Sequence, residues 1–156
     1  MKSVAFAVAV FSVVFSSAVA AADPVAPQSD SPCAPNYADA MTLPSGATMP
    51  LVCQGGQWHA VTTPQPPSDV WLSYGPALAL HGEGKRNPNL RSGEWTATPQ
   101  DSSSQCRAQQ SVVLSPGVVG EPQTTEGQPG RPLEVTVLPR LFDIALSGNC
   151  LWQRND

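Results

Sequence analysis

The chain has 156 residues, 17 of them proline and 12 glycine, and a formal net charge of −4 at pH 7. Acidic side chains outnumber basic ones, 12 to 8, which excludes the basic surface that nucleic-acid binding needs. It also leaves no polybasic segment to attract an anionic membrane surface.

Residues 1 to 22 predict a secretory signal peptide. Lys2 supplies a short positive region, an apolar run follows, and three alanines precede Asp23. Signal peptidase recognises this order of segments, so we expect cleavage between Ala22 and Asp23. The alternative is an uncleaved anchor, against which stand the small residues at the exit and the absence of a basic cluster after them. We therefore expect a secreted protein, extracellular or associated with the cell wall, with no transmembrane segment after cleavage.

Four cysteines follow the signal peptide: Cys33, Cys53, Cys106 and Cys150. Disulfides form and persist in exported proteins, and four cysteines allow three pairings. The sequence favours Cys33–Cys53 and Cys106–Cys150, because a proline-rich linker lies between the two pairs. A four-cysteine zinc site is the alternative, but no C-x2-C spacing supports it. We expect neither a metal nor another cofactor.

The first part of the exported chain divides into three segments. Residues 23 to 35 hold four prolines and predict an extended, flexible N-terminus. Residues 36 to 63 predict a small disulfide-linked hairpin module, because Gly55-Gly56 lies between two β-prone runs and glycine accepts positive φ. Residues 64 to 68 contain three prolines and predict a linker.

Residues 69 to 156 predict a β-domain. A first strand over 70–80 is expected to break at Gly75-Pro76, and residues 116–132 are expected to form a proline- and glycine-rich loop. Apolar and polar residues alternate along 133–137 and 142–147, which is typical of half-buried strands. The fold class predicted is mainly β: a small antiparallel sandwich or open barrel stapled by disulfides, with a flexible proline-rich N-terminus.

Short motifs of the β-domain are similar to those of known exported proteins. They comprise Gly93, Trp95 and Thr96 before Cys106, a pair of strands before Cys150-Leu151-Trp152, and the start Ala22-Asp23-Pro24. In these motifs the chain resembles small secreted actinobacterial proteins of unknown function, of the mycobacterial type. It departs from them at Arg107-Ala108, where an aromatic residue often follows the cysteine. The resemblance implies an exported β-domain.

Catalytic motifs are missing from the sequence. It has no G-x-S-x-G, no H-E-x-x-H and no phosphate-binding G-x-x-x-x-G-K, and its two histidines, His59 and His81, have no spacing that would join them in a site. Five glutamates suit a glycosidase by residue type alone: Glu83, Glu94, Glu121, Glu126 and Glu134. We assign no catalytic residue, and a secreted hydrolase acting on envelope material remains an alternative.

The candidate binding residues lie beside the linker and in the turn that follows the first strand of the β-domain. They are Trp71, Tyr74, His81, Lys85 and Arg86. The alternative for the aromatic residues is that they form the core. Our leading hypothesis is a non-catalytic module that binds a protein or a cell-envelope ligand. A structural or inhibitory partner of another exported protein is the further alternative.

Overall fold

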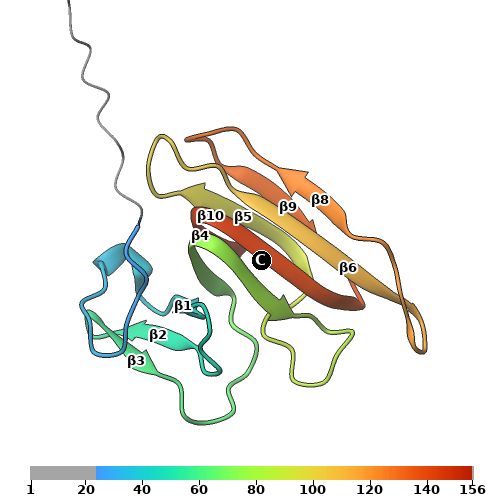
Figure 1. Cartoon of the computed structure of the whole chain (residues 1–156), viewed down its shortest axis with the longest axis horizontal. Helices are drawn as coiled ribbons and strands as arrows, with labels where there is room; N and C mark the ends of the chain where they lie inside the picture. The colour runs from blue at the N-terminus through green and yellow to red at the C-terminus, as the bar shows by residue number, and fades with distance from the viewer. Residues whose placement is uncertain (1–23, 156) are drawn as a thin grey trace, which may run out of the picture.

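The computed structural model describes residues 24–155, which form one mixed sheet of ten strands (Figure 1). The predicted signal peptide and the Ala22–Asp23 cleavage site lie outside these residues. The strands are β1 Met41–Thr42, β2 Leu51–Gln54, β3 Gln57–Ala60, β4 Val70–His81, β5 Gly93–Pro99, β6 Arg107–Ser115, β7 Val118–Val119, β8 Gln123–Glu126, β9 Leu133–Val137 and β10 Leu141–Asn155. A single 3-10 turn, Pro35–Tyr37, precedes β1.

The sheet is organised by its two longest strands, β4 and β10, which pair antiparallel along most of their length. On its other side β10 changes partner: its first half pairs with β6, and its second half pairs with β5. The strand order is β3-β2-β1-β4-β10-β5-β9, while β6, β7 and β8 branch from β10. The sheet does not close into a barrel, and the two branches contribute buried side chains to one core. The mainly β, disulfide-stapled class expected from the sequence is confirmed.

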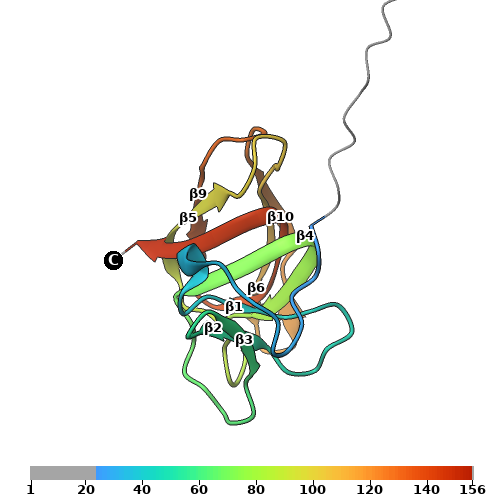
Figure 2. The same ribbon diagram turned by 90° about the vertical axis from the view of Figure 1, so that its left-hand side faces the viewer.

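The hairpin module belongs to the same sheet as the β-domain. β2 and β3 pair as predicted, and the turn between them places Gly55 at φ 59° and Gly56 at φ 80°, a conformation that favours glycine at both positions. β1 connects the module to β4, with Met41 aligned in parallel to Trp71. Figure 2 shows the module on one side of β4, with β10 and β5 on the other.

Two details differ from the sequence prediction. β4 runs without a break through Gly75-Pro76, because the irregularity in its pairing with β10, between Leu146 and Gly148, lies opposite this point; proline is tolerated at such bulges. The predicted loop 116–132 contains β7 and β8. Residues 123–126 of that loop contain no proline or glycine, and they form β8, which pairs with β6.

Two clusters of buried side chains stabilise the sheet. The main core contains three tryptophans, Trp71, Trp95 and Trp152, together with the inward residues of β9 and β10. A smaller cluster surrounds the first disulfide and consists of Cys33, Ala40, Leu51, Cys53, Trp58, Leu72 and Leu151. The disulfides join Cys33 to Cys53 and Cys106 to Cys150, which is the sequential pairing that the sequence favours.

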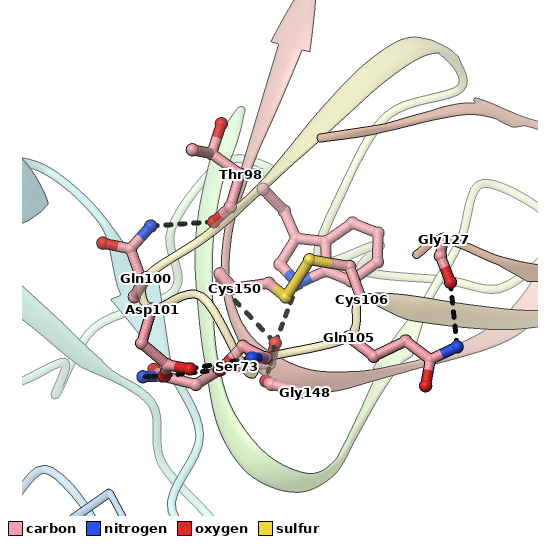
Figure 3. The surroundings of a disulfide bond; sticks show 12 residues. Ser73, Thr98, Gln100, Asp101, Gln105, Cys106, Gly127, Gly148 and Cys150 are labelled. Atoms are coloured by element: carbon pink, nitrogen blue, oxygen red, sulfur yellow. Dashed lines mark hydrogen bonds between the residues drawn. A yellow bond between two sulfur atoms is a disulfide. The ribbon is translucent and has the colours of Figure 1, made fainter. Parts of the chain in front are cut away.

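The second disulfide lies beside a buried hydroxyl at the centre of the sheet (Figure 3). Ser73 Oγ donates to the Gly148 carbonyl at 2.7 Å and accepts the indole proton of Trp152 at 2.8 Å. Gly148 has φ 89°, and a Cβ there would collide with the Gln105 carbonyl. The change of partner along β10 therefore depends on a glycine held against this hydroxyl.

The outer strands β3 and β9 have hydrogen-bond partners on the sides that face away from the sheet. The Gln110 side chain, from β6, donates to the Thr136 carbonyl at 3.0 Å and accepts the Leu138 N–H at 3.1 Å, beside β9. Along β3, the Trp58 N–H donates to the Ser31 carbonyl at 2.9 Å. The N-terminal segment is predicted to be extended and flexible. In the structure it makes a turn, where Asp30 has φ 64° and the Ser31 N–H donates to the Gln28 carbonyl, and its residues 30–33 pair with β3 and the turn before it.

Candidate functional site

The two aromatic candidate binding residues are buried. Trp71 is 1% exposed and Tyr74 is 6% exposed. The reason is the position of β4, which contributes Trp71 to the main core and Leu72 to the smaller cluster, so both faces of this strand are covered. The Tyr74 hydroxyl accepts the Ser45 N–H at 2.8 Å. The sequence left a binding surface and the core as alternatives for the aromatic residues, and for Trp71 and Tyr74 the structure supports the core.

The three polar candidates lie at the far end of β4 and in the following turn. His81 is exposed, and its backbone pairs with Asn89 through two hydrogen bonds. Lys85 places its ammonium group 3.8 Å from the centre of the Phe142 ring, a cation–π contact. Arg86 is exposed. The five candidates therefore do not form one cluster.

Trp71 nevertheless lines the largest of the described cavities, a groove of about 700 Å³ between the hairpin module and the β-domain. We call it the proline groove, because five of its lining residues are prolines. The lining residues of the groove come from β1 and the loop after it, from residues 61–67, from β4 and from the turn at 87–89. The lining is Met41, Thr48, Met49, Pro50, Val61, Thr63, Pro64, Gln65, Pro66, Pro67, Trp71, Asn87, Pro88 and Asn89.

The wall formed by residues 62–67 follows from its prolines, which cannot donate to a strand ladder and so keep this segment outside the sheet. Backbone hydrogen bonds fasten it at both ends. The Val61 N–H donates to the Pro50 carbonyl at 2.9 Å, and the Ser68 N–H donates to the Asn89 carbonyl at 2.8 Å. The predicted linker is thus one side of a groove of ligand-binding size.

The indole nitrogen of Trp71 is a buried donor with no hydrogen-bond partner among the described residues. The other two tryptophans of the main core differ. Trp95 Nε1 donates to the Arg91 carbonyl at 3.1 Å, and Trp152 Nε1 donates to Ser73 Oγ at 2.8 Å. An unsatisfied buried donor costs about 1 to 3 kcal/mol. Trp71 thus combines an unpaired buried donor with a position in the lining of the largest described cavity.

The groove lining contains no ionisable side chain; its polar groups are threonine hydroxyls and the amides of Gln65, Asn87 and Asn89. Two smaller cavities, of about 320 and 570 Å³, lie near Tyr74 beneath residues 24–27. In the first of these, burial raises the pKa of the Tyr37 hydroxyl. The proline groove is the largest of the three and is the one beside an unpartnered donor.

Three of the glutamates considered for catalysis, Glu83, Glu94 and Glu134, accept hydrogen bonds from neighbouring side chains at the surface. Thr136 donates to Glu94 and Thr96 donates to Glu134, both at 3.0 Å, across β5 and β9. The Ser92 hydroxyl and N–H bond to Glu83 and lower the pKa of that carboxyl. A glycosidase acid requires the opposite shift.

Metal ligands and membrane-spanning segments were sought within residues 24–155. In that part of the chain no three histidine, cysteine, aspartate or glutamate side chains gather where they could hold a metal ion. No helix there is long and apolar enough to cross a membrane. No protein-family model, curated protein or solved structure matches the chain.

Sequence reasoning identified Trp71 but not its surroundings. The groove combines residues separated by up to 48 positions, from Met41 to Asn89, and the parallel pairing of β1 with β4 brings them together. The one local signal was the proline-rich segment 64–68, whose composition excludes it from the sheet. No pattern in the sequence indicated that Trp71 Nε1 would have no partner.

Proposed function

We propose that this chain is an exported, non-catalytic binding module, and that the proline groove is its binding site. The observation that carries the proposal is Trp71, which lines a groove of about 700 Å³ and whose indole proton has no partner among residues 24–155. Ligand sites are typically concave, mostly apolar and equipped with few polar groups, as this groove is. The two disulfides suit an oxidising compartment outside the cytoplasm.

Export is tested by measuring the intact mass of the protein recovered from the culture medium. We expect a mass that lacks residues 1–22 and corresponds to two disulfides. A mass that includes those residues, or four reactive thiols, would contradict the exported, oxidised form.

The binding site is tested with isotope-labelled, oxidised protein and a library of small uncharged fragments, followed by nuclear magnetic resonance. We expect shift changes to concentrate on the groove, including Met49 and Val61. Met49→Glu should abolish them, because it places a carboxylate at a rim position that is 44% exposed. The matched control is Val118→Glu, at a residue 48% exposed on β7, which should leave them unchanged. Fragments that bind away from the groove, or equal loss in both variants, would refute the assignment.

A further inference from the structure

The chain has two pairs of adjacent threonines, and the structure places them in opposite settings. Thr124 and Thr125 lie in β8, where their backbone pairs with β6. Thr62 and Thr63 lie outside the strands, at the start of the segment 62–67, and both are exposed. The same two side chains are therefore held in a sheet at one place and presented on unpaired backbone at the other.

The hydroxyl groups of Thr62 and Thr63 have no hydrogen-bond partner in the part of the chain that the structure describes. Three other threonines use their hydroxyls within the protein. Thr42, Thr96 and Thr136 each donate to a carbonyl or carboxylate oxygen at 2.8 to 3.0 Å. The two hydroxyls of the segment are thus exposed and free to react with a group brought from outside the protein.

The backbone around these hydroxyls is extended and unpaired. Pro64, Pro66 and Pro67 have no N–H to donate to a strand, and the residue before a proline is confined to extended conformations. Hydrogen bonds of Val61 and Ser68 fasten the two ends, and no backbone hydrogen bond joins the residues between them to another described segment. Proteins that recognise proline-containing segments use such a preformed backbone, because it loses little conformational entropy on binding. The segment therefore suits an enzyme that must take an acceptor chain into its cleft.

The composition of the segment indicates which group is transferred. Hydroxyl-bearing residues among prolines are typical of O-glycosylated stretches of exported proteins. The two disulfides suit the same exported state. A sugar is bulky and well hydrated, so it requires side chains that face solvent, as Thr62 and Thr63 do.

We propose that Thr62 and Thr63 are O-glycosylation sites, an inference that rests on the export proposed above and not on the binding role. In the transfer, threonine Oγ forms a bond to the anomeric carbon of a phosphate-activated sugar donor. The bond from that carbon to the phosphate oxygen breaks, the phosphate leaves with the electron pair, and a base of the transferase takes the hydroxyl proton. Because Thr63 also lines the proline groove, a sugar on it stands beside that groove.

The test is the intact mass of the protein recovered from the culture medium of the organism that encodes it. We expect the mass of residues 23–156 with two disulfides, increased by a whole number of sugar units. Electron-transfer fragmentation of the same sample should place the sugars on Thr62, Thr63 or both. This measurement uses the unaltered protein, so it does not depend on the folding of a variant.

A matched pair of variants gives the second readout. Thr62→Val with Thr63→Val keeps the branched shape of both side chains, removes their hydroxyls, and should abolish the sugar mass. Thr124→Val with Thr125→Val is the control and should leave the sugar mass unchanged. An unmodified mature chain, sugars only at other residues, phosphate in place of sugar, or equal sugar mass in both variants would overturn the inference and leave export standing. A mass that retains residues 1–22 and carries no sugar would overturn export and this inference together.

Discussion

The hairpin module buries one tryptophan, Trp58, in a small cluster around Cys33–Cys53, whereas the β-domain buries three in a continuous core. The module reaches the rest of the sheet through β1, a strand of two residues, while β4 and β10 pair over most of their length. The comparison indicates that the β-domain is stable through its own packing. The module has a disulfide of its own and packs on the β-domain, since its Val52 belongs to the main core and Leu72 and Leu151 belong to its small cluster. The proline groove lies where the two regions meet.

The largest expected effect comes from the β-domain core. Trp152→Ala removes a side chain that is 1% exposed and should lower the free energy of unfolding by about 3 to 5 kcal/mol, measured by urea denaturation. Trp58→Ala is the matched change in the module and should instead speed amide exchange mainly in β2 and β3. Equal loss of protection across both regions in the two variants would show that the sheet unfolds as one unit.

The disulfides sharpen the comparison further. Their sequence separations of 20 and 44 correspond to about 3 and 4 kcal/mol of stabilisation in the chain-entropy account. Replacing Cys106 and Cys150 by serine should lower the stability of the whole chain. The same replacement of Cys33 and Cys53 should speed amide exchange within the module and leave exchange protection in β4 and β10 intact, as measured by mass spectrometry. Loss of protection in β10 would contradict this.

A smaller effect is expected at Gln110, which joins the two branches of the β-domain. Gln110→Ala leaves the Thr136 carbonyl and the Leu138 N–H without this partner and should cost about 1 to 3 kcal/mol. Gln110→Glu keeps an acceptor for Leu138 and loses the donor to Thr136, so it separates the two hydrogen bonds. Denaturation midpoints of both variants check the prediction; an unchanged midpoint for the alanine variant would contradict it.

The smallest effect concerns the turn after β5. Asp101 accepts hydrogen bonds from Ser103, Ser104 and Asn149, which hold the pKa of its carboxyl well below the usual range. Its contribution to stability is thus complete above about pH 4, where the unfolded carboxyl is ionised, and is lost as pH falls further. Asp101→Asn should reduce the fall in melting temperature that occurs as the pH is lowered below about 4, measured in a series of thermal melts. An unchanged fall in melting temperature at low pH would show that other carboxyls cause the loss of stability.

Local patterns in the sequence predicted much of the fold. The alternation of Leu133, Val135 and Val137 set the inward face of β9, and Gly55-Gly56 marked the turn of the hairpin. These features depend on residues close together in the chain, where periodicity and turn conformation act directly.

Features that depend on distant residues were not predictable. The partner change along β10 requires Gly148 to meet the Gln105 carbonyl, and the burial of Trp71 requires both the module and the β-domain to cover β4. The candidate site was predictable in one residue, Trp71, and its environment was predicted wrongly. Sequence identifies a large aromatic residue without indicating which surfaces will enclose it.

The hydrogen bonds made by Gln110 and by residues 30–33 have a consequence for behaviour at high concentration. An exposed strand edge is a template on which other chains can add strands, and this is a route to aggregation. Here an amide side chain occupies the Thr136 carbonyl of β9 and the N–H of Leu138 just after it, and the N-terminal segment occupies backbone groups of β3. Both ends of the main strand path therefore offer fewer free backbone groups to which a strand of another chain could add.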